Sequence, residues 1–161
     1  RLEARLEERG VNIRSMEAGE QDLEQVFELS LRSFADNYLY SPISRAEFFA
    51  LYEKIIPLLQ PEFVLLAERE EKVIGFVFAV PEPKQKGVLI AKTLAVDPDW
   101  RHLGLGSVLI DKVQANAQKL GFDRAIHALQ HETNDSLKIT KRNEGRRIRT
   151  YALFSKSLRH Q

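Results

Sequence analysis

The stretch Leu94–Ser107 reads LAVDPDWRHLGLGS and decides how the rest of the chain is interpreted. It passes from the end of an apolar strand, through Asp97-Pro98, to Gly104 and Gly106 at the start of a helical pattern. Glycine lets the backbone come close to a ligand. The N–H groups of a first helical turn have no partner inside the helix, so they favour an anion, and the helix dipole adds to this preference. The stretch therefore predicts a cradle for a phosphate group.

Two common phosphate-binding motifs do not match this cradle. The chain holds no G-x-x-x-x-G-K-[ST], which excludes a P-loop. Leu109 stands where the third glycine of G-x-G-x-x-G would be, which excludes the dinucleotide fingerprint. Considered by itself, a pair of glycines at a helix start is also compatible with a helix that binds nothing.

Strands and helices alternate on both sides of the cradle. Apolar periodicity, with glycine and proline as breaks, predicts each element. In chain order these are a charged helix over 1–9, a strand over 11–16, a helix carrying Leu23 to Phe34, a helix carrying Phe48 to Ile56, a hairpin over 63–80, a strand over 88–96, a helix over 104–120, a strand over 124–129, a helix over 134–143 and a last strand over 148–158. This order predicts a mixed α/β fold.

The composition of the 161-residue chain narrows the function classes. The absence of cysteine excludes a disulfide framework, a thiolate nucleophile and a Cys-built zinc site. A formal net charge of +1 does not suggest a general nucleic-acid binder. No apolar run is long enough to span a bilayer, so we expect no membrane partner and a cytoplasmic location. We expect residues 1–10 to form a helical stub or linker and residues 11–161 to form one domain.

The residues around the glycines have the spacing Val96-x-Pro98-x-x-Arg101-x-x-Gly104-x-Gly106. This pattern resembles the acetyl-CoA-binding motif of the GNAT superfamily of N-acyltransferases. The resemblance implies an α/β fold with a central, mixed, mostly antiparallel sheet flanked by helices. It also implies that acetyl-CoA or another acyl-CoA is the co-substrate. The acyl group would then pass to an amine acceptor, a small molecule or a peptide, by direct attack.

Other parts of the chain are similar to the same family. Gly75 stands in V-I-G-F within the predicted hairpin, and Asn134 is followed eleven residues later by Gly145. The resemblance covers residues 11–158. It implies that residues 11–161 are an acyl-CoA N-acyltransferase domain.

The resemblance implies a role for each part of the cradle. The backbone of Leu94, Ala95 and Val96 would lie against the pantetheine arm of CoA. An N–H near Leu94 would stabilise the oxyanion that forms at the thioester carbonyl. Asn134 would contact the pantetheine side. The residues expected to bind the pyrophosphate are Arg101, His102, Leu103, Gly104, Leu105, Gly106 and Ser107.

The sequence departs from the family where a general acid is expected. The family often has a tyrosine seven residues after the helix asparagine, and this position is Lys141. Tyr151, in the predicted last strand, would then protonate the leaving thiolate, unless it is a strand aromatic with its hydroxyl at the surface. Lys141 is expected to bind a phosphate of the cofactor. Ser136 is a further residue on the cofactor side, or it caps the helix.

His127 and His131 stand four residues apart in and after a predicted strand. Four strand residues span about 13 Å, too far for one metal ion, so no metal site is predicted. His127 is either a structural residue or the general base for the acceptor amine. Glu132 and Asp135 are the other candidate bases.

The segment Lys138–Arg149 is rich in basic residues. It is a solvated surface, a contact to the 3′-phosphate of CoA, or a patch for nucleic acid, and the balanced charge elsewhere argues against nucleic acid. The loop tyrosines Tyr38 and Tyr40 are the candidates for acceptor binding. Two alternatives to an enzyme stay open: a non-catalytic acyl-CoA-binding domain of a larger protein, and a nucleic-acid-binding module. A homodimer and an upstream domain are further partners that the sequence leaves open.

Overall fold

The computed structural model describes residues 2–17, 19–37 and 40–158. It is an α/β fold built on a five-stranded sheet in the order β1-β2-β3-β4-β5. Neighbouring strands are antiparallel, except that β4 and β5 are parallel. The strands are β1 (Asn12–Ser15), β2 (Val64–Arg69), β3 (Lys72–Pro81), β4 (Val88–Val96) and β5 (Arg124–His127). The expected fold class, a mixed and mostly antiparallel sheet flanked by helices, is confirmed.

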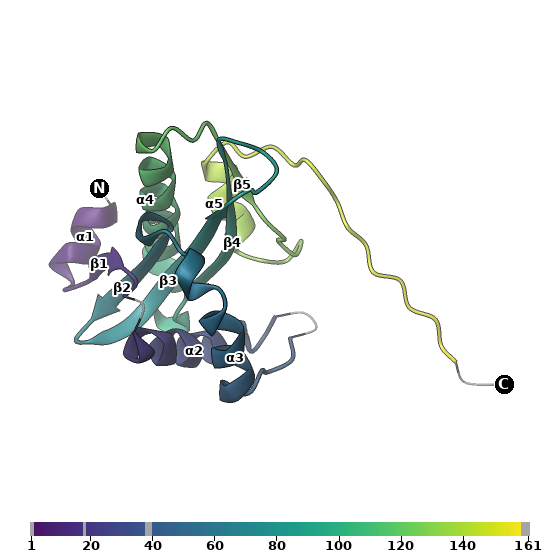
Figure 1. The fold of residues 1–161 in the computed structure, drawn as a ribbon, viewed down its shortest axis with the longest axis horizontal. Helices are drawn as coiled ribbons and strands as arrows, with labels where there is room; N and C mark the ends of the chain where they lie inside the picture. The colour runs from purple at the N-terminus through teal and green to yellow at the C-terminus, as the bar shows by residue number, and fades with distance from the viewer. Residues whose placement is uncertain (1, 18, 38–39, 159–161) are drawn as a thin grey trace.

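Helices cover both faces of this sheet (Figure 1). The α-helices are α1 (Leu2–Glu8), α2 (Glu20–Phe34), α3 (Arg45–Glu53), α4 (Leu105–Lys119) and α5 (Ser136–Arg142). Short 3-10 turns, η1 (Ile56–Leu58), η2 (Pro61–Phe63) and η3 (Pro98–Leu103), connect the main elements. Among the described residues, no helix is both long and apolar enough to cross a membrane.

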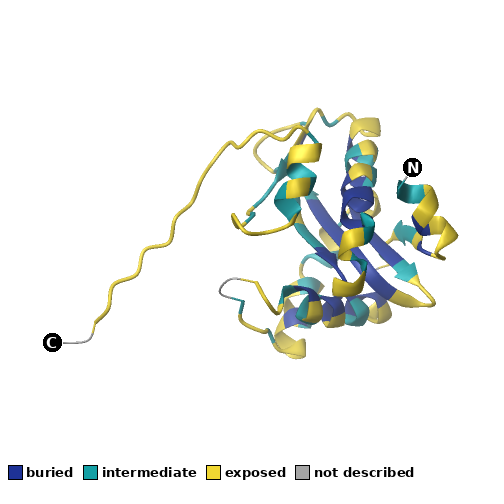
Figure 2. Ribbon diagram, turned by 180° about the vertical axis from the view of Figure 1, so that it is seen from behind, coloured by how far each residue is buried: buried dark blue, intermediate teal, exposed yellow. Residues whose placement is uncertain are grey.

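Side chains alternate between the two faces of the sheet along each strand, so the core consists of two apolar clusters, one on each face. Leu65 and Ala67 of β2 pack in the cluster that includes α1 and α4. Val64 and Leu66 of the same strand pack in the cluster that includes α2 and α3. Successive strand residues point to opposite faces, so an apolar run of this kind requires helices on both sides of the sheet. Figure 2 shows the buried strands enclosed between the two groups of helices.

The observed boundaries of α4, the helix at the cradle, agree with those predicted from the sequence. α4 begins at Leu105, one residue after the expected start, and the chain leaves it at Gly121, where φ is +83°. Glycine adopts this left-handed conformation without steric penalty, which explains why the helix ends there. α1 confirms the helix expected near the N-terminus, and its Leu6 is buried.

The predicted last strand over 148–158 is wrong. Residues 143–158 contain no helix and no strand, and Figure 1 shows this segment running away from the body of the protein. Its apolar side chains are 61–95 % exposed; they are Ile148, Tyr151, Leu153, Phe154 and Leu158. Aromatic and β-branched residues favour a strand only when a neighbouring strand pairs with their backbone. Among the described residues, β5 pairs with β4 alone, and its outer edge has no partner.

Candidate functional site

The candidate site begins where β4 and β5 separate. The two strands pair in parallel only from Val88 to Ala91 of β4, and the last bond joins the Ala128 N–H to the Ala91 carbonyl. Leu129 follows with a φ of +28°, a conformation that leucine rarely adopts, and the chain turns away from β4. Within the described part of the chain, residues 93–96 of β4 therefore pair with β3 on one side and with no strand on the other.

β4 carries an extra residue at the same place. Phe78 pairs with Thr93 and Ala79 with Ala91, so Lys92 has no counterpart on β3. A β-bulge of this kind bends the strand and changes the direction of the residues that follow. The predicted cofactor-binding residues 94–96 thus directly follow a bulge. The same bulge marks the point where the edge of β4 that faces β5 stops pairing with it.

The turn after β4 brings the chain to the start of α4. Asp97 accepts a hydrogen bond from the Asp99 N–H and caps η3. Gly104 has a φ of +81° and forms the N-cap of α4. No side chain caps this helix, so the N–H groups of its first turn are left for water or a ligand. The predicted cradle therefore has the unpaired donors that an anion requires.

Gly106 lies at the centre of the cradle. A Cβ built at this position would be 3.1 Å from Ile139 Cδ1, 3.4 Å from Leu94 Cδ2 and 3.5 Å from Val96 Cγ2. The first of these distances is shorter than ordinary van der Waals contact, so a side chain fits at this position only if Ile139 moves. Ile139 belongs to α5, and its contact places that helix directly against β4 and the start of α4. The structure thus brings the predicted residues of β4, α4 and α5 together.

Arg101 makes contacts that its sequence position did not predict. Its Nη2 donates to the Ser33 carbonyl at 2.6 Å, and its Nε donates to the Val96 carbonyl at 3.3 Å. The Ser33 hydroxyl donates to the same Val96 carbonyl. Arg101 therefore links the last turn of α2 to the end of β4. Its predicted contact with pyrophosphate stays a prediction.

Replacing Arg101 by alanine is expected to lower the free energy of unfolding by about 1.5–3 kcal/mol, the range for hydrogen bonds made by charged groups. Urea unfolding followed by circular dichroism measures this loss. Arg142→Ala is a matched control, because its guanidinium pairs at the surface with Asp111 at 3.9 Å and should contribute less. Unchanged stability of Arg101→Ala, together with weakened cofactor binding, would instead favour direct contact with the pyrophosphate.

His127 connects β5 to the two neighbouring helices. Its Nε2 lies 3.0 Å from Gln114 Nε2 of α4, and its Nδ1 lies 2.9 Å from Thr140 Oγ1 of α5. The Thr140 hydroxyl donates to Gln130 Oε1, so the proton must sit on Nδ1 of the imidazole. Burial lowers the pKa of His127, which agrees with a neutral ring. With both nitrogens engaged inside the protein, these contacts favour the structural alternative over the general base.

The other predicted residues of α5 lie around its start. The Asn134 side-chain oxygen accepts the Ser136 N–H, so Asn134 caps this turn. The Ser136 hydroxyl accepts a hydrogen bond from Gln130. Asp135 pairs with Lys138, whose hydrogen bond lowers the pKa of the carboxyl group. Because α5 packs on Gly106, all these side chains belong to the same region as the cradle.

The remaining candidates are more dispersed. Glu132 and Lys141 are exposed, and Lys141 lies on α5. Tyr40 is half-buried, and Tyr38 lies outside the described residues. Tyr151 is 68 % exposed in the segment after α5, and the structure does not bring it to the cradle. No sequence signal would have found Gln114 or Thr140, because each is thirteen residues from His127 and meets it only through the fold.

Comparison with known proteins gives the same fold and one family. The sequence model of the acetyltransferase (GNAT) family matches residues 23–139. No curated protein matches the sequence. An N-acetyltransferase from Staphylococcus aureus Mu50 is similar in structure, with a TM-score of 0.67, 20 % identity, and coverage of 83 % of this chain and 82 % of that one.

Two aminoglycoside acetyltransferases are similar over almost their whole length. One, from an uncultured soil metagenomic sample in complex with sisomicin, has a TM-score of 0.65 and 18 % identity, and the alignment covers 94 % of this chain and 99 % of that one. The other is an aminoglycoside N-acetyltransferase in complex with CoA, with a TM-score of 0.65, 19 % identity, and coverage of 91 % of this chain and 94 % of that one. At these identities the likeness establishes the fold.

Proposed function

The chain belongs to the acetyltransferase (GNAT) family, and from this premise we propose that it transfers an acyl group from acyl-CoA to a small-molecule amine. The observation that carries the proposal is the uncapped start of α4, which follows directly from the bulged strand β4. Unpaired N–H donors beside a strand edge suit a ligand that has phosphates at one end and an amide-containing arm at the other.

The residues around the cradle fit such a cofactor. The first-turn N–H groups of Leu105, Gly106 and Ser107 would bind the pyrophosphate. The missing side chain at Gly106 lets Ile139 of α5 pack against this turn. The main chain of residues 94–96 would orient the pantetheine arm. When bound, acyl-CoA supplies an acyl group activated as a thioester. An N–H near Leu94 would stabilise the negative charge that develops on the carbonyl oxygen during attack.

Direct attack by the acceptor amine is the simplest route for this chain. It has no cysteine, so a thioester with the protein cannot form. Holding both substrates together then supplies much of the rate. In line with its contacts, His127 positions β5 and α5 and does not itself remove the amine proton.

A small amine is the acceptor class that the comparisons favour. Two of the similar structures are complexes, one with sisomicin and one with a bisubstrate analogue of CoA and monomethyl-acetylneamine. The similarity in fold extends over 91–94 % of this chain, so no large insertion separates it from these enzymes. Tyr40, in the loop between α2 and α3, stays a proposed acceptor contact, and Tyr38 is proposed with it from the sequence alone.

For protonating the leaving thiolate we propose Lys141 in place of Tyr151. It lies on α5, which packs on the cradle, whereas Tyr151 lies on the exposed segment after that helix. We expect Tyr151→Phe to keep its turnover. Lys141→Ala should lose up to about 100-fold, the low end for a general acid, because a thiolate leaves readily. Turnover at saturating acyl-CoA measures both variants, and a loss confined to Tyr151→Phe would mean that the segment folds back over the site.

The proposed function is tested in two steps. Calorimetry first measures binding of CoA and acetyl-CoA to the whole chain. Release of free thiol is then followed with a panel of amines that includes sisomicin, and mass spectrometry identifies the acylated product. Micromolar CoA binding with acceptor-dependent thiol release is the expected result. Binding without release for any amine would support a non-catalytic acyl-CoA-binding protein, and no CoA binding would overturn the proposal.

A further inference from the structure

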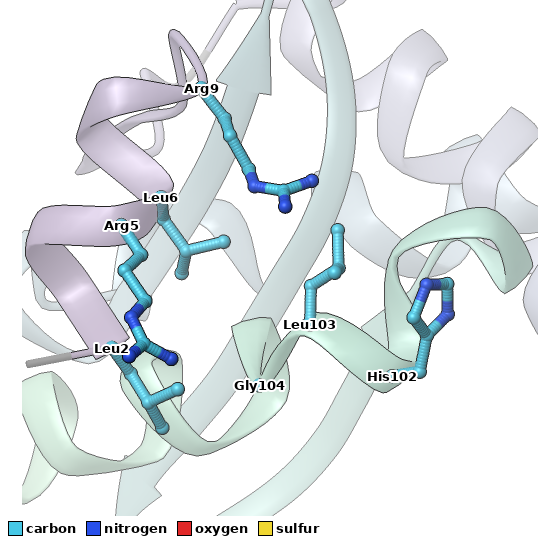
Figure 3. Close-up of a pocket in the computed structure, with 7 residues that line it drawn as sticks. All are labelled: Leu2, Arg5, Leu6, Arg9, His102, Leu103 and Gly104. Carbon is cyan, nitrogen blue, oxygen red and sulfur yellow. The ribbon is translucent and has the colours of Figure 1, made fainter.

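A cavity of about 240 Å³ lies between α1 and the turn that leads into α4 (Figure 3). Its lining residues come from α1, from the turn directly after that helix and from the η3–α4 turn; they are Leu2, Arg5, Leu6, Arg9, His102, Leu103 and Gly104. The family match begins at residue 23, so one wall of this cavity is built from a segment that the family model does not include. The other wall is part of the predicted cradle.

α1 is fixed against this turn by several contacts. A Cβ at Gly104 would lie 3.1 Å from both methyl groups of Leu2, so the helix touches the backbone of the turn. Leu6 is 2 % exposed. At the other end of the helix, Arg69 Nε donates to the Arg9 carbonyl at 3.0 Å. The wall that α1 provides is therefore a packed part of the domain.

The cavity is strongly cationic. Arg5 lies on α1 and Arg9 directly follows the helix, four residues later, and Figure 3 shows both guanidinium groups on the side that faces the 102–104 turn. No carboxylate of the described residues pairs with either arginine. Glu3, the acidic residue of the first turn, pairs instead with Lys112 of α4. Like charges one turn apart repel each other, and a bound anion would relieve this repulsion.

The size of the cavity limits what it can hold. At about 240 Å³ it is below the usual range of pockets that enclose a whole small ligand, roughly 300–1,000 Å³. It suits one phosphate group with part of the sugar that carries it. Arginine is the side chain best shaped to bind phosphate, because its planar fork donates two parallel hydrogen bonds.

We propose that this cavity binds the 3′-phosphate of acyl-CoA through Arg5 and Arg9. The inference rests on the proposed function, since it assigns a second phosphate of the same cofactor. CoA carries a pyrophosphate and a phosphomonoester on one nucleotide. His102, Leu103 and Gly104 line the cavity and also belong to the predicted pyrophosphate cradle, so one ligand can reach both. α1 thereby adds cofactor contacts that the family motif lacks.

The test compares CoA with 3′-dephospho-CoA by calorimetry, on the wild type and on the double variant Arg5→Gln/Arg9→Gln. The wild type should bind CoA about tenfold or more tightly than 3′-dephospho-CoA, as expected for charge-assisted contacts. The double variant should lose this preference and keep the wild-type affinity for 3′-dephospho-CoA. Both arginines are exposed, so the variant is expected to fold, which circular dichroism checks.

A second double variant, Arg146→Gln/Arg147→Gln, removes the same charge from the exposed segment after α5. It should keep the preference for CoA. If it loses the preference and the α1 variant keeps it, the basic segment binds the 3′-phosphate and the cavity proposal is overturned. An equal loss of both ligands in the α1 variant would also overturn it, because the arginines would then not discriminate the 3′-phosphate. If neither ligand binds the wild type, the proposed function itself fails.

Discussion

Replacing Gly106 by glutamate is expected to reduce CoA affinity about 100-fold or more, since overpacking and an uncompensated charge together cost several kcal/mol. The new Cβ would lie 3.1 Å from Ile139 Cδ1, and the residue is buried. The carboxylate would also repel the phosphates that the first turn of α4 is proposed to bind. Calorimetry with CoA measures the loss.

Gly19→Glu is the matched control for this substitution. Gly19 precedes α2 with ordinary backbone angles, and a Cβ there meets nothing within 4 Å. The same side chain in this position should leave CoA affinity unchanged. Because Gly106→Glu also strains the packing of α5, its melting temperature is measured alongside. Wild-type affinity in a folded Gly106→Glu protein would move the cofactor site away from α4.

Arg14→Ala is expected to be the most destabilising of the proposed substitutions. Arg14 of β1 binds both carboxylate oxygens of Asp22 at 2.7 Å and also pairs with Glu68 of β2. Asp22 is 5 % exposed, so removing the arginine leaves a buried charge without its partner. We expect a loss of about 3 kcal/mol, the lower end for a broken buried ion pair, because the Arg14 side chain is itself 29 % exposed.

The pH dependence of unfolding identifies the cause of this loss. Burial alone would raise the pKa of Asp22, but hydrogen bonds from Arg14 and from the Glu17 N–H outweigh it and lower the pKa. The native state thus favours the carboxylate, and this stabilisation is present above the unfolded pKa of about 3.9 and lost as the pH falls through the lower native value. The difference in stability between wild type and Arg14→Ala should therefore narrow below about pH 4.

Arg45→Ala provides the control for this second prediction. Arg45 also pairs with two carboxylates, Glu20 and Glu24, but at the surface. Its removal should leave the urea midpoint close to that of the wild type. If both arginine variants lose equal stability, burial of Asp22 is not the reason. Urea unfolding at several pH values separates these outcomes.

The elements near the cradle could be predicted from sequence because their signals are local. The apolar run of β4 ends at Asp97-Pro98, and the glycines at 104 and 121 mark where α4 begins and ends. Local signals of this kind could not decide whether residues 148–158 form a strand. Their side chains suit a strand, but pairing depends on whether the edge of β5 accepts them, and the structure leaves that edge unpaired.

In the site too, features set by residues close in sequence could be predicted, and contacts between residues far apart in sequence could not. The residues of the motif, from Leu94 to Ser107, could be read in order along the chain. The partners of Arg101 and His127 could not, because Ser33 is 68 residues from Arg101 and reaches it only when α2 packs on the sheet. The segment 2–9 contains no motif, so the proposed role of Arg5 and Arg9 could be inferred only from the cavity that they line.

The short parallel pairing of β4 and β5 has a consequence for how the protein folds and opens. β2, β3 and β4 follow one another as antiparallel neighbours, so their contacts close short loops and should form early. β5 joins through only four residue pairs, after the chain has crossed the sheet in α4. Its amide hydrogens should therefore exchange with solvent faster than those of β3. The proposed cofactor, bound where β4 and β5 separate, would bind only the form in which β5 is paired with β4. Raising its concentration should therefore lower the fraction of molecules in which this pairing is open.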